Sequence, residues 1–486
     1  MTQKKSLLGM ISSPDDLKNI KVEKLDQLAD EIRQLIISTV STTGGHLATN
    51  LGFVDATIAL HYVLNSPADK IIWDVGHQAY THKILTGRRD SMATIRQTGG
   101  ISGFPNKGES PHDHFNVGHA STSISQALGL AVARDLRGRH EHIVAVCGDG
   151  SLTGGLCFEG LNNIASANAS MTIVLNDNKM AISRSIGAMS RYLSKILTNP
   201  LYNRLRTEIE KKLKPFPSLR TFLKHIEKSV KNLIVPGIVF EELGLRYFGP
   251  IDGHDIPLMI ETLENVLKIE QPCILHLITR KGKGYRPAEK ESDKFHSAPP
   301  FDIETGKKNS NGASDDSPRE TYTSAFTRSI VAAAEKDENI LAITAAMPDG
   351  AGLKSFQERF PKRFFDVGIA ESHAVTFAGA LAHDGFKPVC AIYSTFLQRS
   401  YDQLIHDVAL QGANVTFCLD RAGIVGPDGP THHGLYDFAF LRTVPGSVIC
   451  APCNASELDT MLSLGLTYPG PFSIRYPKLT IAPEVE

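Results

Sequence analysis

The sequence has little of several features that mark specialised protein classes. It contains one tryptophan and seven cysteines in 486 residues. It has no excess of charge of either sign, because 51 lysines and arginines stand against 52 aspartates and glutamates. Proteins that bind nucleic acid or an anionic membrane need a basic excess. The balanced charge therefore argues against both classes, and the ligands are expected to be small molecules.

Long apolar runs are also missing. No segment reaches the roughly eighteen uninterrupted apolar residues that suggest a membrane helix. The opening MTQKKSLLGMISSPDDL has two lysines and a short apolar run, but SSPDD interrupts it before a signal-peptide core is complete. We expect a soluble, cytoplasmic protein that binds neither membrane nor nucleic acid.

The cysteines do not form a disulfide framework. Their number is odd, and most lie in apolar runs such as VAVC, VTFC and SVIC. This distribution is typical of reduced thiols in a cytosolic protein. Cys450 and Cys453 form a CxxC pair, but no second pair or nearby histidine completes a zinc set. A redox or zinc role is the less favoured alternative.

A chain of this length is too long for one core and is expected to form two or three domains. The polar stretch 302–320 is the clearest linker. We divide the chain into an α/β half at 1–301, with a solvated helical excursion at about 184–240, and a second α/β half at 321–486. Apolar strands in the second half alternate with helical stretches near 321–335, 371–384, 396–411 and 455–467. This alternation predicts parallel sheets flanked by helices.

The most informative segment is 142–182, where two apolar runs flank a helical stretch. The run HIVAVC ends at Gly148-Asp149-Gly150, and MTIVLN ends at Asn176-Asp177-Asn178. A right-handed crossover brings the ends of two such parallel strands to one edge of the sheet. Asp149 and Asn178 are therefore expected to face one another. GDG alone is as readily an ordinary strand-turn, but the whole unit favours a ligand site.

The groups at this edge suit a metal-bound diphosphate. Carboxylate and amide oxygens, completed by a main-chain carbonyl, suit Mg²⁺, which takes its other ligands from phosphate and water. The helix that begins near Gly155 offers its N-terminus to an anion.

Glu371 ends an apolar run at a second strand-to-helix junction, in FDVGIAESHAVTFAGALA. A partly desolvated carboxyl group there could hold a proton and hydrogen-bond a ligand nitrogen. Taken alone, Glu371 could equally complement the helix dipole. Beside the GDG unit, the functional interpretation is the better one.

Together these motifs resemble the 1-deoxy-D-xylulose-5-phosphate synthase family, transketolase-like thiamine diphosphate enzymes. The resemblance spans nearly the whole chain. Its matching stretches are GGHLATNLG, WDVGHQAYTHKILTGRR, VGHASTSIS, GDGSLTGG, LNDNKMAIS, PGIVFEELGLRYFGPIDGHD, KGKGYRPAEKE, AIYSTFLQRSYDQLIHDVA and DRAGIVGPDGPTHHG. It implies two doubly wound domains, a diphosphate- and Mg²⁺-binding one followed by a pyrimidine-binding one.

The resemblance also assigns the cofactor site. It implies Mg²⁺ ligands at Asp149, Asn178 and the carbonyl of Met180, and Glu371 as the acid that hydrogen-bonds the aminopyrimidine of thiamine diphosphate. The residues implied to line the cofactor are His77, Gly118, His119, Ala120, Gly150, Ser151, Asn178 and Tyr285, together with Glu371.

The substrates implied are pyruvate and D-glyceraldehyde 3-phosphate. Pyruvate loses carbon dioxide, and its remaining two carbons condense with the aldehyde to give 1-deoxy-D-xylulose 5-phosphate, an isoprenoid precursor. Imidazoles can move protons near neutral pH, and guanidinium groups match a phosphate dianion. The implied proton-handling residues are His46, His77, His296 and His432, and the implied acceptor-binding residues are Tyr393, Arg399, Arg421, Asp428 and Arg475.

Few residues near the chemistry depart from the family pattern. Ser372 stands where glutamine is expected, and Ala120 where serine is common, which affects fine substrate preference rather than reaction class. Family members resemble a three-domain arrangement, whereas this chain stops after RYP, so we expect the third, C-terminal domain to be absent. That domain normally helps to cover dimer surface, and a homodimer is still the expected assembly.

Two alternatives remain beside an active transferase of this type. One is a relative that no longer turns over and acts as a binding or regulatory partner. The other is a transketolase-like enzyme with a different donor substrate, against which the DRAGIVG loop argues.

Overall fold

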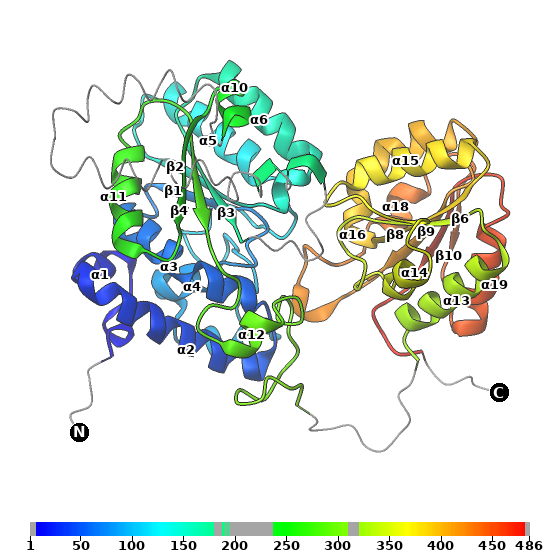
Figure 1. Cartoon of the computed structure of the whole chain (residues 1–486), viewed down its shortest axis with the longest axis horizontal. Coiled ribbons are helices and arrows are strands. Elements are labelled where there is room, and N and C mark those ends of the chain that lie inside the picture. The colour runs from blue at the N-terminus through cyan, green and yellow to red at the C-terminus, as the bar shows by residue number, and fades with distance from the viewer. Residues whose placement is uncertain (1–5, 179–186, 190–191, 194–236, 310–319, 482–486) are drawn as a thin grey trace.

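The computed structural model describes residues 6–178, 187–189, 192–193, 237–309 and 320–481. These residues form two lobes, each a parallel sheet with helices on both faces (Figure 1). The predicted two-sheet α/β class is confirmed. The predicted linker lies between the lobes, but its residues 310–319 are outside the described part of the chain, and the division there stays a prediction.

The first lobe contains a five-stranded sheet in the order β1-β2-β3-β5-β4. Every neighbouring pair is parallel. Its strands are β1 (Lys70–Trp73), β2 (Ile143–Gly148), β3 (Thr172–Asp177), β4 (Arg246–Asp252) and β5 (Cys273–Ile278). Its helices include α1 (Pro14–Lys18), α2 (Leu25–Thr43), α3 (Ala48–Val63), α4 (Tyr80–Lys83), α5 (Ser123–Leu136), α6 (Gly155–Ala167), α10 (Ile238–Glu242), α11 (Ile256–Val266) and α12 (Arg286–Lys290).

Alternate side chains of β2 enter two separate cores. Val144 and Val146 pack into the core formed with α2, α3 and α11. Ala145 and Cys147 point the other way, into the core formed with α5 and α6. Successive strand residues face opposite sides of a sheet, so an apolar run without polar interruption is what a strand covered on both faces requires.

The second lobe contains a six-stranded parallel sheet in the order β10-β11-β9-β8-β6-β7. Its strands are β6 (Ile340–Thr344), β7 (Phe364–Asp366), β8 (Lys387–Tyr393), β9 (Thr416–Asp420), β10 (Val448–Cys450) and β11 (Phe472–Arg475). Its helices include α13 (Tyr322–Lys336), α14 (Lys354–Arg359), α15 (Glu371–His383), α16 (Ser394–Leu397), α17 (Tyr401–Gln403), α18 (Asp437–Leu441) and α19 (Ala455–Gly465).

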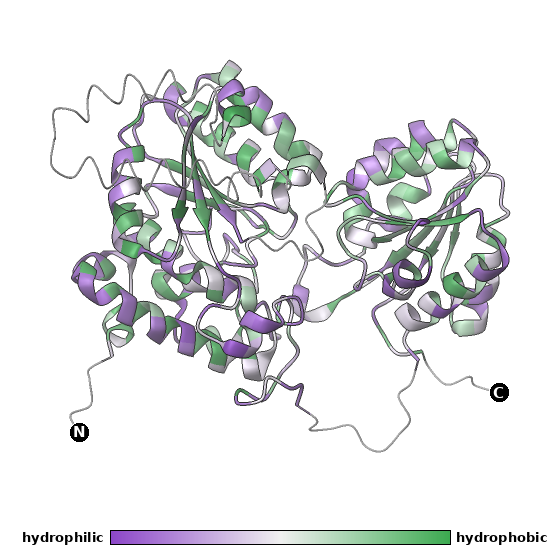
Figure 2. Cartoon of the chain, viewed as in Figure 1, coloured by the Kyte–Doolittle hydropathy of each residue, from purple (hydrophilic) through white to green (hydrophobic). Residues whose placement is uncertain are grey.

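Hydropathy follows the layers in both lobes. The strands are mostly hydrophobic, whereas the helices carry hydrophilic residues along their outer faces (Figure 2). On β8, Val389 and Ala391 join the core with α13 and α19, and Cys390 and Ile392 join the core with α15. Because both faces of such a strand are packed, its end holds the loop that follows it in a fixed position.

One expectation about local structure was incomplete, and one strand was missed. The stretch predicted near 396–411 is helical over 394–409, but it is divided into α16, a 3₁₀ turn at Gln398–Ser400, α17 and a π-helical segment at Leu404–Ala409. The backbone of Ser400, with φ −116° and ψ 22°, leaves the helical region and breaks it. Strand β4 was not predicted, because RYFGPID is only partly buried and is interrupted by an irregularity in its pairing with β5.

The predicted helical excursion at 184–240 lies largely outside the described residues. Among the helices of the described ranges, none is both long and apolar enough to cross a membrane.

Candidate active site

The carboxyl ends of β2 and β3 lie side by side, as predicted for the strand-helix-strand unit. Gly148 pairs with Asn176, and the N–H of Asp149 donates to the Asn176 carbonyl at 3.1 Å. The Asn176 side chain accepts from the Thr279 hydroxyl at 2.6 Å. Asp149 and Asn178 thus follow neighbouring strands at one edge of the sheet. The third implied ligand, Met180, lies outside the described residues.

The residues around this edge satisfy Asp149 and Asn178 only in part, although Lys281 and backbone N–H groups favour the charged form of Asp149. Burial, together with the nearby Asp177 carboxylate, raises the pKa of Asp149 to about 6. The Asn178 Oδ1 atom is buried and has no hydrogen-bond partner among the described residues. A divalent cation would satisfy both oxygens, so the donor set fits Mg²⁺. No cluster of three or more His, Cys, Asp or Glu side chains in the described ranges suits a different metal.

The second lobe contacts the first beside this edge. The N–H of Ile369 donates to the Thr153 hydroxyl at 3.2 Å. A Cβ atom at Gly154 would lie 2.1 Å from the Ser121 hydroxyl oxygen and 3.1 Å from the Ile369 carbonyl oxygen, so only glycine fits between them. This contact brings the start of α15, and with it Glu371, to the segment that follows GDG.

Glu371 is the first residue of α15 and is 5% exposed. Burial raises its pKa, although the Arg399 guanidinium acts in the opposite direction. Arg399 also donates to the Ala120 carbonyl of the first lobe. The structure therefore places Arg399 beside Glu371, and its predicted contact with the acceptor substrate stays a prediction.

Three of the predicted histidines form one group. The ring centroids of His46 and His77 are 5.6 Å apart, those of His77 and His296 are 5.2 Å apart, and those of His46 and His296 are 5.9 Å apart. Burial lowers the pKa of all three, to about 4 for His296. Each has a buried Nδ1 atom without a partner among the described residues. Neutral imidazoles with free nitrogens can exchange protons with a ligand.

Asn50 connects the loops that carry two of these histidines. Its amide donates to the carbonyls of His46 and His77, at 2.6 and 2.7 Å. Its Oδ1 atom accepts the N–H of Tyr80 at 2.8 Å. Our reading of the sequence missed Asn50, although it lies within the quoted stretch GGHLATNLG.

The predicted arginines of the second lobe are held rigidly. Arg421 stacks on Tyr393 with its guanidinium carbon 4.1 Å from the ring centroid, and Arg475 stacks on Phe438 at the same distance. Each also pairs with a buried aspartate at 2.8 Å, Arg421 with Asp420 and Arg475 with Asp437. The arginine side chains remain 14% and 16% exposed, so each can still meet an anion.

His432 belongs to the segment DRAGIVGPDGPTHHG of the second lobe and lies where that segment meets the first lobe. Its ring stacks on Phe104, with centroids 5.0 Å apart and planes 15° from parallel. Asp428 pairs with Arg96 of the first lobe at 2.9 Å. Neither Phe104 nor Arg96 was predicted. They lie in a loop without helical or strand periodicity, which gave no signal in the sequence.

The predicted cofactor-lining residues of the VGHAST segment also contact the second lobe. The His119 Nε2 atom lies 2.8 Å from the Thr431 carbonyl oxygen and 3.1 Å from the Thr395 hydroxyl oxygen. A Cβ atom at Gly118 would lie 2.2 Å from the Thr431 hydroxyl oxygen. Ser151 is buried, and its carbonyl accepts from the Ser121 hydroxyl at 2.8 Å.

Tyr285 lies apart from these contacts. Its ring packs against Phe295 and Phe301, and its hydroxyl donates to the Ile303 carbonyl at 2.8 Å. Its predicted contact with the cofactor stays a prediction. In the same KGKGY segment, Lys281 is buried. Burial lowers the pKa of the Lys281 ammonium group, and the Asp149 carboxylate acts to raise it. Lys281 is thus a further charged neighbour of the metal edge that our reading did not assign.

Comparison with known proteins identifies the chain. A family model described as 1-deoxy-D-xylulose-5-phosphate synthase matches residues 8–279. The chain belongs to the 1-deoxy-D-xylulose-5-phosphate synthase family. It is therefore a transketolase-like transferase of a thiamine diphosphate-dependent family, as the motifs predicted. A second model, described as the pyrimidine binding domain of transketolase, matches residues 320–483.

Similar relatives of the synthase family are known from several bacteria. The 1-deoxy-D-xylulose-5-phosphate synthase of Caldanaerobacter subterraneus is 53% identical over 97% of this chain and 76% of the relative. That of Desulforudis audaxviator is 52% identical over 98% of this chain and 74% of the relative. The chain thus spans about three quarters of their length. A solved transketolase from Campylobacter jejuni is 18% identical, with a TM-score of 0.45 and coverage of 96% of this chain and 80% of its own.

The contact at Gly118 predicts a defect in cofactor binding. Gly118→Ala should push Thr431 away and weaken thiamine diphosphate binding by roughly tenfold or more, because overpacked contacts are costly. Gly129→Ala in α5 is the matched control, since a Cβ atom there meets nothing within 4 Å. Isothermal titration of both variants with the cofactor and Mg²⁺ measures the effect. Equal affinities would contradict a close approach of the lobes at Gly118.

The buried histidines predict a stability that depends on pH. In the folded chain His296 and His432 have pKa values of about 4, below their ordinary value of 6.5. The unfolded chain therefore binds more protons between these values, and the free energy of unfolding should fall as pH is lowered from about 6.5 to about 4. His296→Gln should make this decline shallower. Urea unfolding at several pH values tests it, and an unchanged slope would contradict the assignment of a neutral His296.

Proposed function

We propose that this chain catalyses the decarboxylative condensation of pyruvate with D-glyceraldehyde 3-phosphate. Pyruvate loses carbon dioxide, and one carbon-carbon bond forms between its keto carbon and the aldehyde carbon, giving 1-deoxy-D-xylulose 5-phosphate. The observation that carries the proposal is the contact of the two lobes at Gly154 and Ile369, which brings Glu371 beside the GDG edge within one chain.

The cofactor site in this proposal uses groups from both lobes. Asp149 and Asn178, with the Met180 carbonyl that the family resemblance implies, would hold Mg²⁺, which would neutralise the charge of the diphosphate. Gly150, Ser151 and His119 would line the bound cofactor. When bound, thiamine diphosphate supplies a nucleophilic carbon and accepts the electron pair that carbon dioxide leaves behind.

Glu371 acts as a hydrogen-bond donor to the pyrimidine ring of the cofactor. A carboxyl group can donate only when it is protonated, and burial raises the pKa of Glu371 in that direction. Its position at the start of a rigid helix fixes the direction of the bond. The same residue lies at the interface between lobes, so the donor is correctly placed only when they are together.

Substrate handling is divided between imidazoles and guanidinium groups. His46, His77 and His296 are neutral and in ring contact with one another, and their unpartnered Nδ1 atoms would take up and return protons of the donor. Arg421 and Arg475 bind the phosphate of the acceptor, since stacking and aspartate pairing hold both planar groups in place. His432 and Asp428 orient the aldehyde and hydroxyl groups of the acceptor.

The direct test supplies both substrates, thiamine diphosphate and Mg²⁺ to the purified chain. We expect release of carbon dioxide and formation of the five-carbon phosphate. Glu371→Gln, which cannot serve as an acid, should lower turnover by roughly a hundredfold or more. The exposed Glu358→Gln is the control for removing a carboxylate and should keep full activity.

The outcomes separate this proposal from its alternatives. Cofactor binding without turnover would favour a non-catalytic relative. Turnover of a donor other than pyruvate would favour a different transketolase-like activity.

We further propose that the chain acts as a homodimer. Four exposed apolar side chains lie in the segment DRAGIVGPDGPTHHG (420–434) or directly after it, up to and including α18. They are Ile424 at 77%, Leu435 at 53%, Tyr436 at 65% and Phe438 at 42% exposure. The backbones of Gly423 and Gly434 pair, which brings Ile424 and Leu435 close together. An apolar patch of this kind is typical of a surface that a partner covers.

The patch predicts how the dimer would be broken. Leu435→Glu should shift sedimentation from dimer to monomer, because a charge would be buried in the contact. Leu136→Glu is the matched control, since Leu136 is 83% exposed at the end of α5, away from the patch. A wild-type chain that sediments as a monomer at all concentrations would exclude the homodimer.

A further inference from the structure

Phe104 occupies a position between the two groups of histidines. Its side chain is 3% exposed. Its ring lies face to face with His432, at 5.0 Å and 15°, and is tilted against His46 at 5.5 Å and 58°. It therefore forms an apolar wall shared by the histidines of the donor side and the imidazole of the acceptor side.

Phe104 is the neighbour that fixes the ring plane of His432. The other ring contacts of His432 in the described residues are edge-on, with Phe396 at 76° and His119 at 70°. The Nδ1 atom of His432 also lies 3.1 Å from the adjacent Thr431 hydroxyl oxygen. Edge contacts and one hydrogen bond allow the ring to tilt, whereas a parallel stack restricts it.

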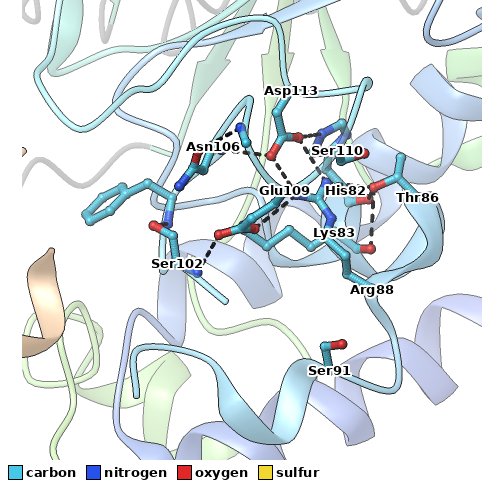
Figure 3. A network of polar contacts seen from close by, with 12 residues as sticks. His82, Lys83, Thr86, Arg88, Ser91, Ser102, Asn106, Glu109, Ser110 and Asp113 are labelled. Atoms are coloured by element: carbon cyan, nitrogen blue, oxygen red, sulfur yellow. Dashed lines mark hydrogen bonds and ion pairs between the residues drawn. The ribbon is translucent and has the colours of Figure 1, made fainter. Parts of the chain in front are cut away.

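Phe104 lacks support from a helix or strand and is held by two carboxylates instead, the buried Asp113 and the partly buried Glu109. Glu109 accepts the backbone N–H of Ser102 at 2.7 Å, and Asp113 accepts the backbone N–H of Asn106 at 2.7 Å (Figure 3). These two bonds secure the chain two residues before and two residues after Phe104. We call Glu109 and Asp113 the clamp carboxylates.

Cations from the α4 region hold the clamp carboxylates in turn. Lys83 pairs with Glu109 at 2.5 Å, and Arg88 makes two bonds to Asp113, at 2.5 and 2.9 Å (Figure 3). His82 contributes a third bond to Asp113 at 2.7 Å. Although burial acts to raise the pKa of Asp113, hydrogen bonds from His82 and Arg88 hold it well below its ordinary value. The carboxylate therefore stays charged, and a buried charge is held to the geometry of its partners.

We propose that Phe104 is a positioning residue for His432 in the condensation with the aldehyde, and that the clamp carboxylates hold Phe104 in that position. This inference rests on the proposed function only in assigning His432 to the acceptor. The ion pairs lie in the first lobe and His432 lies in the second. The clamp therefore sets the position of the Phe104 ring, the surface of the first lobe on which His432 stacks.

The proposal has a consequence for protonation as well as orientation. Burial lowers the pKa of His432 to about 4, with smaller contributions from the charged groups around it. Asp428 favours the protonated form, whereas His119, Arg96 and His433 disfavour it. Removing the Phe104 ring admits water to one face of the imidazole, so the pKa should rise toward its ordinary value.

Kinetics of paired variants test the orienting role. Phe104→Leu keeps an apolar side chain but loses the ring plane, and should lower kcat/KM for the aldehyde by roughly tenfold. Carbon dioxide release from pyruvate alone should fall by less than the aldehyde reaction, because Phe104 is only tilted against His46 but stacks face to face on His432. Phe104→Tyr keeps the ring and should restore the wild-type value. Phe356→Leu, a buried substitution in the second-lobe core, controls for loss of packing.

A double-mutant cycle decides whether Phe104 acts through His432. In a His432→Ala background, Phe104→Leu should have little further effect on the aldehyde reaction, because interacting residues are not additive. Equal losses in both backgrounds would overturn the proposal.

An NMR titration of His432 tests the same contact without turnover. The resonance is assigned from its loss in His432→Ala. Phe104→Ala should raise the titration midpoint, and Arg88→Lys should do so to a smaller extent, because lysine lacks the two-pronged bond to Asp113. Arg134→Lys, at another largely buried arginine, should leave it unchanged. A midpoint unaffected by Phe104→Ala would overturn the contact, and one unaffected by Arg88→Lys would overturn the clamp.

The two experiments separate this inference from the proposed function. If the wild-type chain makes no product but the midpoint shifts as described, the proposed function fails and the placement of Phe104 stands. If product forms and Phe104→Leu reacts with the aldehyde as fast as the wild type, the proposed function stands and the positioning role of Phe104 fails.

Discussion

The site depends on a close approach between the two lobes that glycine alone permits. Gly118 faces Thr431, and Gly154 lies between Ser121 and the Ile369 carbonyl, at distances that leave no room for a side chain. Short polar contacts from His119 to Thr431 and from Ile369 to Thr153 complete the approach. Each lobe carries only some of the predicted site residues. Their function as one site is therefore a property of this interface rather than of either sheet.

Neutral imidazoles meet in the interior of the site, with the charged side chains of Arg96 and Lys281 nearby. The pKa values of these imidazoles are lowered by burial, and several nitrogens lack partners in the described residues. Unsatisfied buried polar atoms destabilise a fold, so their concentration here indicates that a ligand normally satisfies them. The clamp beneath Phe104 differs, since its lysine and arginine pair with its two carboxylates, although the Arg88 Nε atom has no partner among the described residues. The fold thus places ion pairs around the site and leaves neutral imidazoles with unsatisfied nitrogens within it.

Much of the architecture could be predicted from the sequence, because strong local patterns carry it. The runs around β2 and β3 are short, apolar and bounded by glycine or asparagine, and their spacing placed Asp149 and Asn178 at one edge. The family motifs led to Glu371 and the histidines in the same way. The helical stretch predicted near 396–411 is confirmed as helical, but its division was not predicted, because helical periodicity does not reveal the backbone break at Ser400. Phe104 and Arg96 could not be predicted, since buried ion pairs place their loop and no periodic pattern reports such pairs.

The bonds made by Asn50 have a consequence for how this family can vary. One amide bonds the carbonyls of His46 and His77 and the N–H of Tyr80, so it links the two histidine loops directly, in addition to the chain that joins them. Residues 51–76, which include most of α3 and all of β1, form that connection. Insertions or deletions in its surface turns should therefore leave the spacing of the imidazoles intact. At this point of the fold, substitutions in the connecting segment 51–76 can occur independently of substitutions in the two histidine loops.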